Sequence, residues 1–156
     1  IRVYQTNNRN QKKHTSVQNI QKYEKKFLNH KSFNQFKKKV VLSKIKLYSL
    51  LKNLKSQNKK IFGVGAPSRA ATLINYVGLN EDIIKYILEI KGSYKIGKYM
   101  PGTNIPIVEE NIFKKEKPDY LLLFSWHISK SLIKNFKSKG FKGKFIIPLP
   151  KPFIVR

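Results

Sequence analysis

Short apolar segments alternate with helical segments from residue 60 onward, and this pattern restricts the fold more than any other feature. Residues 61–64 run into a glycine turn, and residues 119–125 form the unbroken apolar run of a strand buried on both faces. Further strands are predicted over residues 83–90, 105–108 and 144–148, with helices over 67–76, 109–113 and 128–139. Such alternation forms a mostly parallel sheet with flanking helices, so the sequence predicts an α/β fold.

Two amphipathic helices are predicted before this domain. Ser16 is a candidate N-cap for a helix through residue 29, whose apolar side carries Val17, Ile20, Tyr23 and Phe27. A second helix over residues 32–57 has an apolar stripe at spacings of three and four: Phe33, Phe36, Val40, Leu47, Leu50, Leu51 and Leu54. We expect this stripe to pack on the next domain, with a solvated lysine face opposite.

The net charge of +25, from 33 basic and 8 acidic residues, favours a nucleic-acid partner at first sight. However, 29 of the basic residues are Lys and only 4 are Arg, whereas base readout and stacking favour the planar guanidinium. Lys, Asn and Ile, which have AT-rich codons, together make up 60 residues against 3 Ala. We attribute most of the charge to codon bias and consider nucleic-acid binding by residues 16–57 the weaker alternative.

Several chemistries are excluded or unsupported by the sequence. The absence of Cys excludes a disulfide scaffold, a thiolate zinc site and a cysteine nucleophile in this chain. No apolar run approaches the ~18 residues of a membrane span. No Ser-His-Asp order, carboxylate pair or metal-ligand spacing stands out, so we predict no catalytic residue and no metal ligand here. Because the first residue is Ile1, we expect the chain to begin partway through a longer protein.

A glycine turn follows the first predicted strand and leads into a helix. Such a turn lets the backbone approach a ligand, and the N–H groups at the helix start suit a phosphate. The residues of this segment are Gly63, Gly65, Ala66, Pro67, Ser68 and Arg69. The fingerprint G-x-G-x-x-G is met only in part, since Ser68 replaces the third glycine, and Glu89 is the one acid near the end of the second strand. A purely structural tight turn is the alternative.

Two further segments are predicted at the same carboxyl edge of the sheet, where open α/β sheets bind ligands. Lys95, Tyr99, Gly102 and Thr103 lie in the loop after the second strand and could hold a phosphate and sugar hydroxyls. Ser125, Trp126 and His127 lie at the carboxyl end of the strand over 119–125 and would line the same crevice. The alternatives are a structural loop and a Trp that serves in packing beside a partly exposed His.

Taken together, these segments resemble the sugar C-methyltransferases. Residues 63–76 (GVGAPSRAATLINY) resemble G-x-G-A-P-A-K-G-N-T-L-L-N-Y of that family, and residues 95–107 (KIGKYMPGTNIPI) resemble K-x-G-x-x-x-P-G-T-x-I-P-I. Residues 117–120 with 125–127 resemble K-P-D-Y…A-W-N, and residues 145–150 resemble F-I-x-P-L-P. Residues 1–3 fit the strand that ends the preceding domain, and residues 16–17 fit the start of the linking helix. The similarity extends in order over essentially the whole chain.

The resemblance implies a Rossmann-like carboxyl-terminal domain that holds a nucleotide-diphosphate sugar. It divides the chain into residues 1–15 as the end of an upstream domain and a connector, 16–58 as a helical linker, and 59–156 as that domain. The family uses S-adenosylmethionine to methylate a carbon of a nucleotide-linked deoxy-keto-sugar. The donor site, the zinc-binding cysteines and the catalytic His and Tyr would lie upstream of Ile1, so the chain alone would be an inactive fragment of a cytoplasmic enzyme.

The resemblance also adds Thr72 and Asn75 to the substrate-binding residues. We expect Arg69 and Lys95, with the backbone N–H groups from Ala66 to Arg69, to face the diphosphate. Four departures from the family pattern leave the sugar open: Arg69 replaces Lys, Ala70-Ala71 replaces Gly-Asn, His127 replaces Asn, and Glu89 replaces Asp. A Rossmann-like nucleotide-binding domain without methyl transfer is the second alternative.

Overall fold

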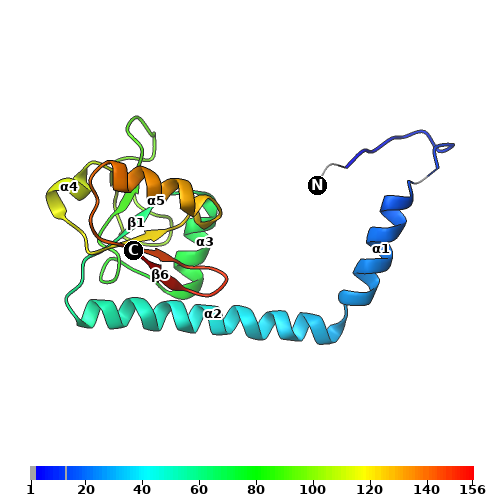
Figure 1. The fold of residues 1–156 in the computed structure, drawn as a ribbon, viewed down its shortest axis with the longest axis horizontal. Helices are drawn as coiled ribbons and strands as arrows, with labels where there is room; N and C mark the ends of the chain where they lie inside the picture. The colour runs from blue at the N-terminus through cyan, green and yellow to red at the C-terminus, as the bar shows by residue number, and fades with distance from the viewer. Residues whose placement is uncertain (1–2, 13) are drawn as a thin grey trace. The chain divides into compact units, whose positions relative to one another are not determined.

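A computed structural model describes residues 3–12 and 14–156 of the chain. The described chain divides into two compact units, one that ends at Val40 and one over Val41–Arg156. Helix α1 (Thr15–Phe27) lies in the first unit, and helix α2 (His30–Ser56) begins there and ends in the second (Figure 1). Of the strand that the resemblance places at residues 1–3, positions 1 and 2 lie outside the described residues, and Val3 has no regular structure.

Both predicted amino-terminal helices are present, but Ser16 is not the N-cap of α1. The cap is His14, whose Nδ1 accepts a hydrogen bond from the Ser16 backbone N–H at 3.3 Å and lies 2.8 Å from the Ser16 hydroxyl. An imidazole nitrogen can accept from a free N–H group of the first turn as a hydroxyl oxygen does. Ser16 therefore lies inside the first turn of α1, and its backbone N–H and hydroxyl group contact the capping residue His14.

The second unit is built on one six-stranded sheet, in the order β3-β2-β1-β4-β5-β6. Its strands are β1 (Ile61–Val64), β2 (Ile87–Glu89), β3 (Ile107–Glu109), β4 (Tyr120–Leu123), β5 (Lys144–Ile147) and β6 (Phe153–Val155). All neighbouring strands are parallel except β5 and β6, which are antiparallel. This is the strand order of the Rossmann fold. The predicted α/β class with a mostly parallel sheet and flanking helices is confirmed.

Two strand predictions need correction. The segment 83–90 is a strand only over Ile87–Glu89, because Ile83 and Ile84 are buried from a turn instead of a strand. Strand β6 was not predicted: Pro150 and Pro152 precede it, and its Phe153 and Ile154 are exposed, as edge strands allow.

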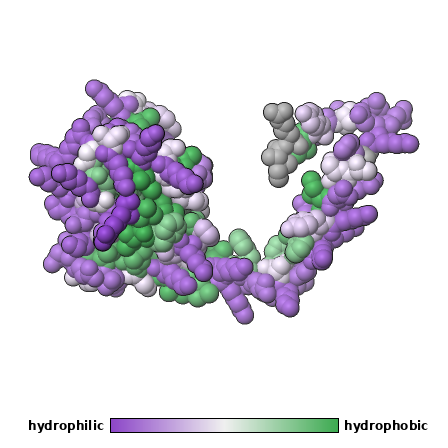
Figure 2. All heavy atoms as spheres, viewed as in Figure 1, coloured by the Kyte–Doolittle hydropathy of each residue, from purple (hydrophilic) through white to green (hydrophobic). Residues whose placement is uncertain are grey.

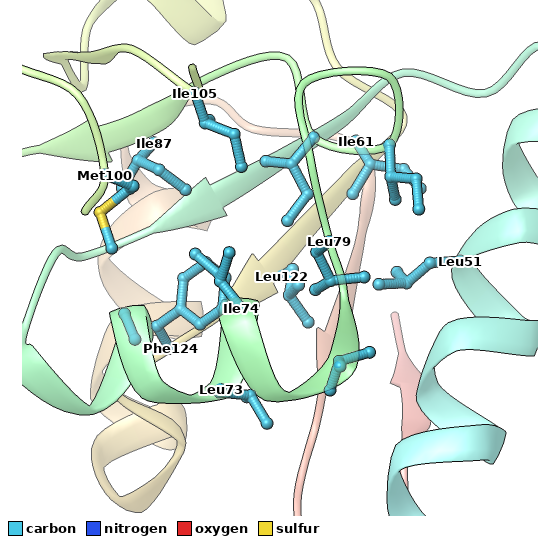
Figure 3. Packing of buried hydrophobic residues seen from close by; sticks show 14 of the residues in the cluster. Leu51, Ile61, Leu73, Ile74, Leu79, Ile87, Met100, Ile105, Leu122 and Phe124 are labelled. Atoms are coloured by element: carbon cyan, nitrogen blue, oxygen red, sulfur yellow. The ribbon is translucent and has the colours of Figure 1, made fainter. Parts of the chain in front are cut away.

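Two hydrophobic clusters cover the two faces of the sheet. One face packs on α3 (Ser68–Val77) and the carboxyl-terminal half of α2, and the other packs on α4 (Ile112–Glu116) and α5 (Ser129–Ser138). Within β1, Ile61 belongs to the first cluster and Phe62 to the second, as the period of two in a strand requires. Figure 3 shows Leu51 of α2, Ile74 of α3 and the strand residue Leu122, which belong to the first cluster. The chain between β1 and β4 thus follows the βαβ pattern predicted from the sequence.

The apolar stripe of α2 is buried over only part of its length. Leu47, Leu51 and Leu54 are buried in the first cluster, as predicted. In contrast, Phe33 and Phe36 are 57% and 66% exposed, so the expected packing on the next domain is wrong for this end of the stripe. The reason is that the second unit begins only at Val41.

Candidate functional site

The strand order changes direction between β1 and β4, the two central parallel strands. The chain leaves β1 toward β2 and β3 on one side and continues from β4 toward β5 on the other. In an open α/β sheet, such a switch point leaves a crevice at the carboxyl ends of the strands. The segments after β1, β2 and β4 meet at this edge, and they carry the residues predicted from the sequence as a substrate site, except Gly63, which lies inside β1.

The glycine turn after β1 is held by an acidic side chain from β2. Gly65 has a φ of +82°, a conformation that favours glycine, and a side chain there would lie 3.4 Å from the Ser125 hydroxyl. The next residue, Ala66, donates its backbone N–H to Glu89 Oε2 at 2.8 Å, and the Ile90 N–H donates to the other carboxylate oxygen at 3.3 Å. The Ala66 N–H group, which we expected to face a diphosphate, is therefore already bonded.

Lys95 binds the backbone carbonyl group of Ala66. Its ammonium group donates to the Ala66 carbonyl oxygen at 2.8 Å, and its side chain is partly buried. Glu89 and Lys95 thus engage the N–H and the C=O of Ala66 from the second strand and from the loop that follows it. An ammonium group has three donors, so this bond leaves two for another acceptor.

Arg69, Trp126 and His127 come together across the switch point. Arg69 lies in the first turn of α3, and its Nη1 is 3.1 Å from Nδ1 of His127. Since a guanidinium only donates, the His127 Nδ1 accepts, which places the proton of the neutral ring on Nε2. The Arg69 guanidinium carbon also lies 5.8 Å from the Trp126 ring centre. Trp126 is partly buried and packs against both hydrophobic clusters, so it gives Arg69 a fixed support.

Other predicted site residues have structural contacts. Gly63 lies inside β1, and a Cβ there would be 2.5 Å from Ile87 Cδ1 and from Phe124 Cε2. Asn75 donates to the carbonyl oxygens of Ala71 and Pro101, both at 2.8 Å, and so ties α3 to the loop. Gly102, at a φ of +79°, leaves room for the Asn75 amide. The Thr103 hydroxyl donates to the Met100 carbonyl at 3.0 Å. These four positions shape the edge from inside.

The remaining predicted residues are accessible. Ser68, Thr72 and Tyr99 are exposed, Pro67 is half-buried, and Pro67 is the N-cap residue of α3 without a side-chain cap bond. In the sequence, Glu89 stands out for its spacing from Gly65 and as a departure from the family pattern, and Ser125 is singled out with Trp126 and His127, but neither Glu89 nor Ser125 is predicted as a contact of the glycine turn. The spacing of an acid about 20 residues after a glycine turn was a usable signal for the first. For Ser125 the signal was its position at the carboxyl end of a predicted strand, whereas its approach to Gly65 depends on the pairing of β4 with β1.

Within residues 3–12 and 14–156, no group of three or more His, Cys, Asp or Glu is placed to hold a metal ion. None of the helices in this described part is both long and apolar enough to cross a bilayer. The pKa of the Glu116 carboxyl group, which lies four residues before β4, is lowered by the hydrogen bond that Lys85 donates. Glu116 is the last residue of α4 and Lys85 precedes β2, so this pair is separate from the residues of the candidate site.

Comparison with known proteins identifies the family. The model of the C-methyltransferase C-terminal domain matches residues 1–150. C-methyltransferase NovU of Streptomyces niveus is 31% identical over 109 residues, which cover 68% of this chain and 25% of that protein. The chain thus spans about a quarter of the length of this relative. The matched region includes β1 to β5 and the three segments at the sheet edge, and so the chain belongs to the family of C-methyltransferase C-terminal domains.

Proposed function

We propose that this chain is the substrate-holding domain of an S-adenosylmethionine-dependent C-methyltransferase that acts on a nucleotide-linked keto-deoxysugar. The observation that carries the proposal is the position of Arg69, which lies at the switch point of a Rossmann-type sheet, in the first turn of α3, and is supported by Trp126 and His127. Membership of the family supports the reaction class, and the resemblance of the edge segments supports the sugar substrate.

The chain's own contribution is to bind and orient the substrate. Arg69 would neutralise the diphosphate, helped by the N–H groups of Ser68 and Arg69 at the start of α3. Lys95 would reach the same anion with the donors that its bond to Ala66 leaves free. A fixed diphosphate restricts the position of the attached sugar, and such positioning lowers the entropic part of the barrier.

The reacting groups belong to the rest of the protein. S-adenosylmethionine would supply an electrophilic methyl group to the carbon next to the sugar's keto group. We place three features expected from the resemblance in the upstream part: the donor site, the base and the zinc-binding cysteines. We also propose that the whole enzyme is cytoplasmic. In this proposal, this chain contributes the substrate contacts alone.

Binding measurements on the full-length protein test the proposal. We expect Arg69→Ala to weaken the binding of thymidine diphosphate, measured by titration calorimetry, by about 10- to 100-fold, the loss typical of a charge-assisted hydrogen bond. Arg69→Lys should recover part of the affinity, because it keeps the charge but not the planar fork. Lys142→Ala, which removes an exposed cation before the amino end of β5, at the opposite edge of the sheet, is the matched control and should leave the affinity unchanged. An unchanged affinity in Arg69→Ala would remove the assignment.

A further inference from the structure

The first unit exposes an apolar surface that covers one side of two helices. On α1 it consists of Val17, Ile20, Tyr23 and Phe27, and on the first turns of α2 it consists of Phe33 and Phe36. We call these six residues the linker face. Each is at least 41% exposed, and Phe36 is 66% exposed. Figure 2 shows apolar atoms on one side of the α1 segment and hydrophilic atoms on the other.

The linker face has the order of a packing surface. Its four α1 residues follow the spacing of three and four that aligns side chains on one side of a helix. The Tyr23 and Phe27 rings lie 4.4 Å apart between their centres, so they form one continuous aromatic patch. In α2, Phe33 and Phe36 continue the stripe whose later members, Leu47, Leu51 and Leu54, are buried in the core. Exposed apolar patches rimmed by polar residues mark interaction surfaces.

The charge around the linker face restricts what can cover it. Residues 14–40 contain seven Lys residues and one acid, Glu24. Two copies of this chain that met through the linker face would bring these like charges together, which opposes self-association. An apolar surface bordered by Asp and Glu has the complementary charge. The expected partner surface is therefore apolar at its centre and acidic at its rim.

We infer that the linker face docks onto the remaining part of the same methyltransferase polypeptide, on an apolar, acid-rimmed surface of that part. The inference rests on the proposed function. On this chain, the exposed stripe and the positive charge support the inference. From the comparisons, the length of the relative supports it. The match is to a C-terminal domain, and it covers 25% of the relative's length, so most of that relative lies outside the matched region.

Hydrogen exchange on the full-length protein tests the inference. Amides of residues 14–40 should exchange slowly in the wild-type protein, because docking protects a helix that has no buried residue of its own. Phe27→Glu places a negative charge inside the linker face and should raise these exchange rates at least tenfold. Gln18→Glu is the matched control: it makes the same change in charge on the opposite side of α1 and should leave the exchange slow. Phe27→Ala, which keeps the helix without adding a charge, should give an intermediate rate.

Other outcomes overturn the inference. Rapid exchange of residues 14–40 in the wild-type protein would show that nothing covers the linker face. A concentration-dependent dimer in sedimentation velocity that Phe27→Glu abolishes would assign the linker face to a second copy. Binding to vesicles containing phosphatidylserine that Phe27→Glu abolishes would assign it to an anionic membrane surface. Failure of the proposed function is recognised separately, from the thymidine diphosphate titration of Arg69→Ala, since Arg69 belongs to the second unit.

Discussion

Gly63 offers a direct test of how tightly the sheet centre is packed. Its φ is not positive, so Ala fits the backbone, and any cost of Gly63→Ala comes from the added methyl group. That methyl would lie 2.5 Å from both Ile87 Cδ1 and Phe124 Cε2, and this distance is shorter than packed side-chain atoms allow. Ile87 and Phe124 are fully buried, so neither can swing into solvent. Overpacking of this kind costs about 1–3 kcal/mol.

A second substitution removes one of the two clashes. Ile87→Val deletes Cδ1, the atom nearest to the added methyl, and by itself costs about 0.5–1.5 kcal/mol. In the double variant, part of the cost of Gly63→Ala should disappear, with a coupling of about 0.5–1 kcal/mol. The ring of Phe124 remains in place, so the recovery should be incomplete.

Urea unfolding measures these free energies, with Trp126 as a probe inside the second unit. Gly78→Ala is the contrasting control: its φ is +82° and no atom lies within 4 Å, so its cost is backbone strain that Ile87→Val cannot relieve. Additive costs in the double variant, or a Gly63→Ala protein as stable as the wild type, would refute the packing argument.

Three further predictions concern the core, the surface charges and nucleic acids. Leu51→Ala should lower the free energy of unfolding by about 2–5 kcal/mol in urea titrations, since Leu51 is fully buried. The Lys85 hydrogen bond lowers the pKa of Glu116 below 4.5. This pair therefore stabilises the fold above that pH, and its contribution is lost as the pH falls through the lowered pKa. Glu116→Gln should reduce the drop of the urea unfolding midpoint in acid. At ~0.15 M salt the chain should bind duplex DNA no more tightly than ~1 μM, and tighter, steeply salt-dependent binding in a fluorescence-anisotropy titration would restore the nucleic-acid alternative.

The strand and helix alternation could be predicted because local apolar runs determine it. Strands β1 and β4 are continuous apolar runs buried on both faces, and α3 ends at Gly78 in the left-handed conformation that favours glycine. Local patterns failed where burial came from a turn or where a strand lies at an edge. Residues 83–84 are buried without pairing, and β6 pairs with β5 although its Phe153 and Ile154 are exposed.

The candidate site was predictable as a location and not as a set of contacts. The carboxyl edge follows from strand order, so the three segments could be placed there from the sequence. The partners of Ala66 could not, because they depend on side chains 23 and 29 residues away in sequence. The Arg69–His127 contact joins positions 58 residues apart, and only the adjacency of β1 and β4 brings them together.

The few acidic residues should tolerate substitution less well than the many lysines, a difference that the net charge does not show. The chain has 8 acids against 33 basic residues. In the second unit, the bonded acids include Glu89 at the glycine turn, Glu110 with Lys139, Glu116 with Lys85, and Asp119 with the Lys60 N–H. Most lysines on exposed faces can be exchanged at little cost, because surface substitutions are usually within about 0.5 kcal/mol. A laboratory library that randomises charge should therefore recover varied lysines and the least variation at position 89, whose carboxylate accepts from the N–H groups of Ala66 and Ile90.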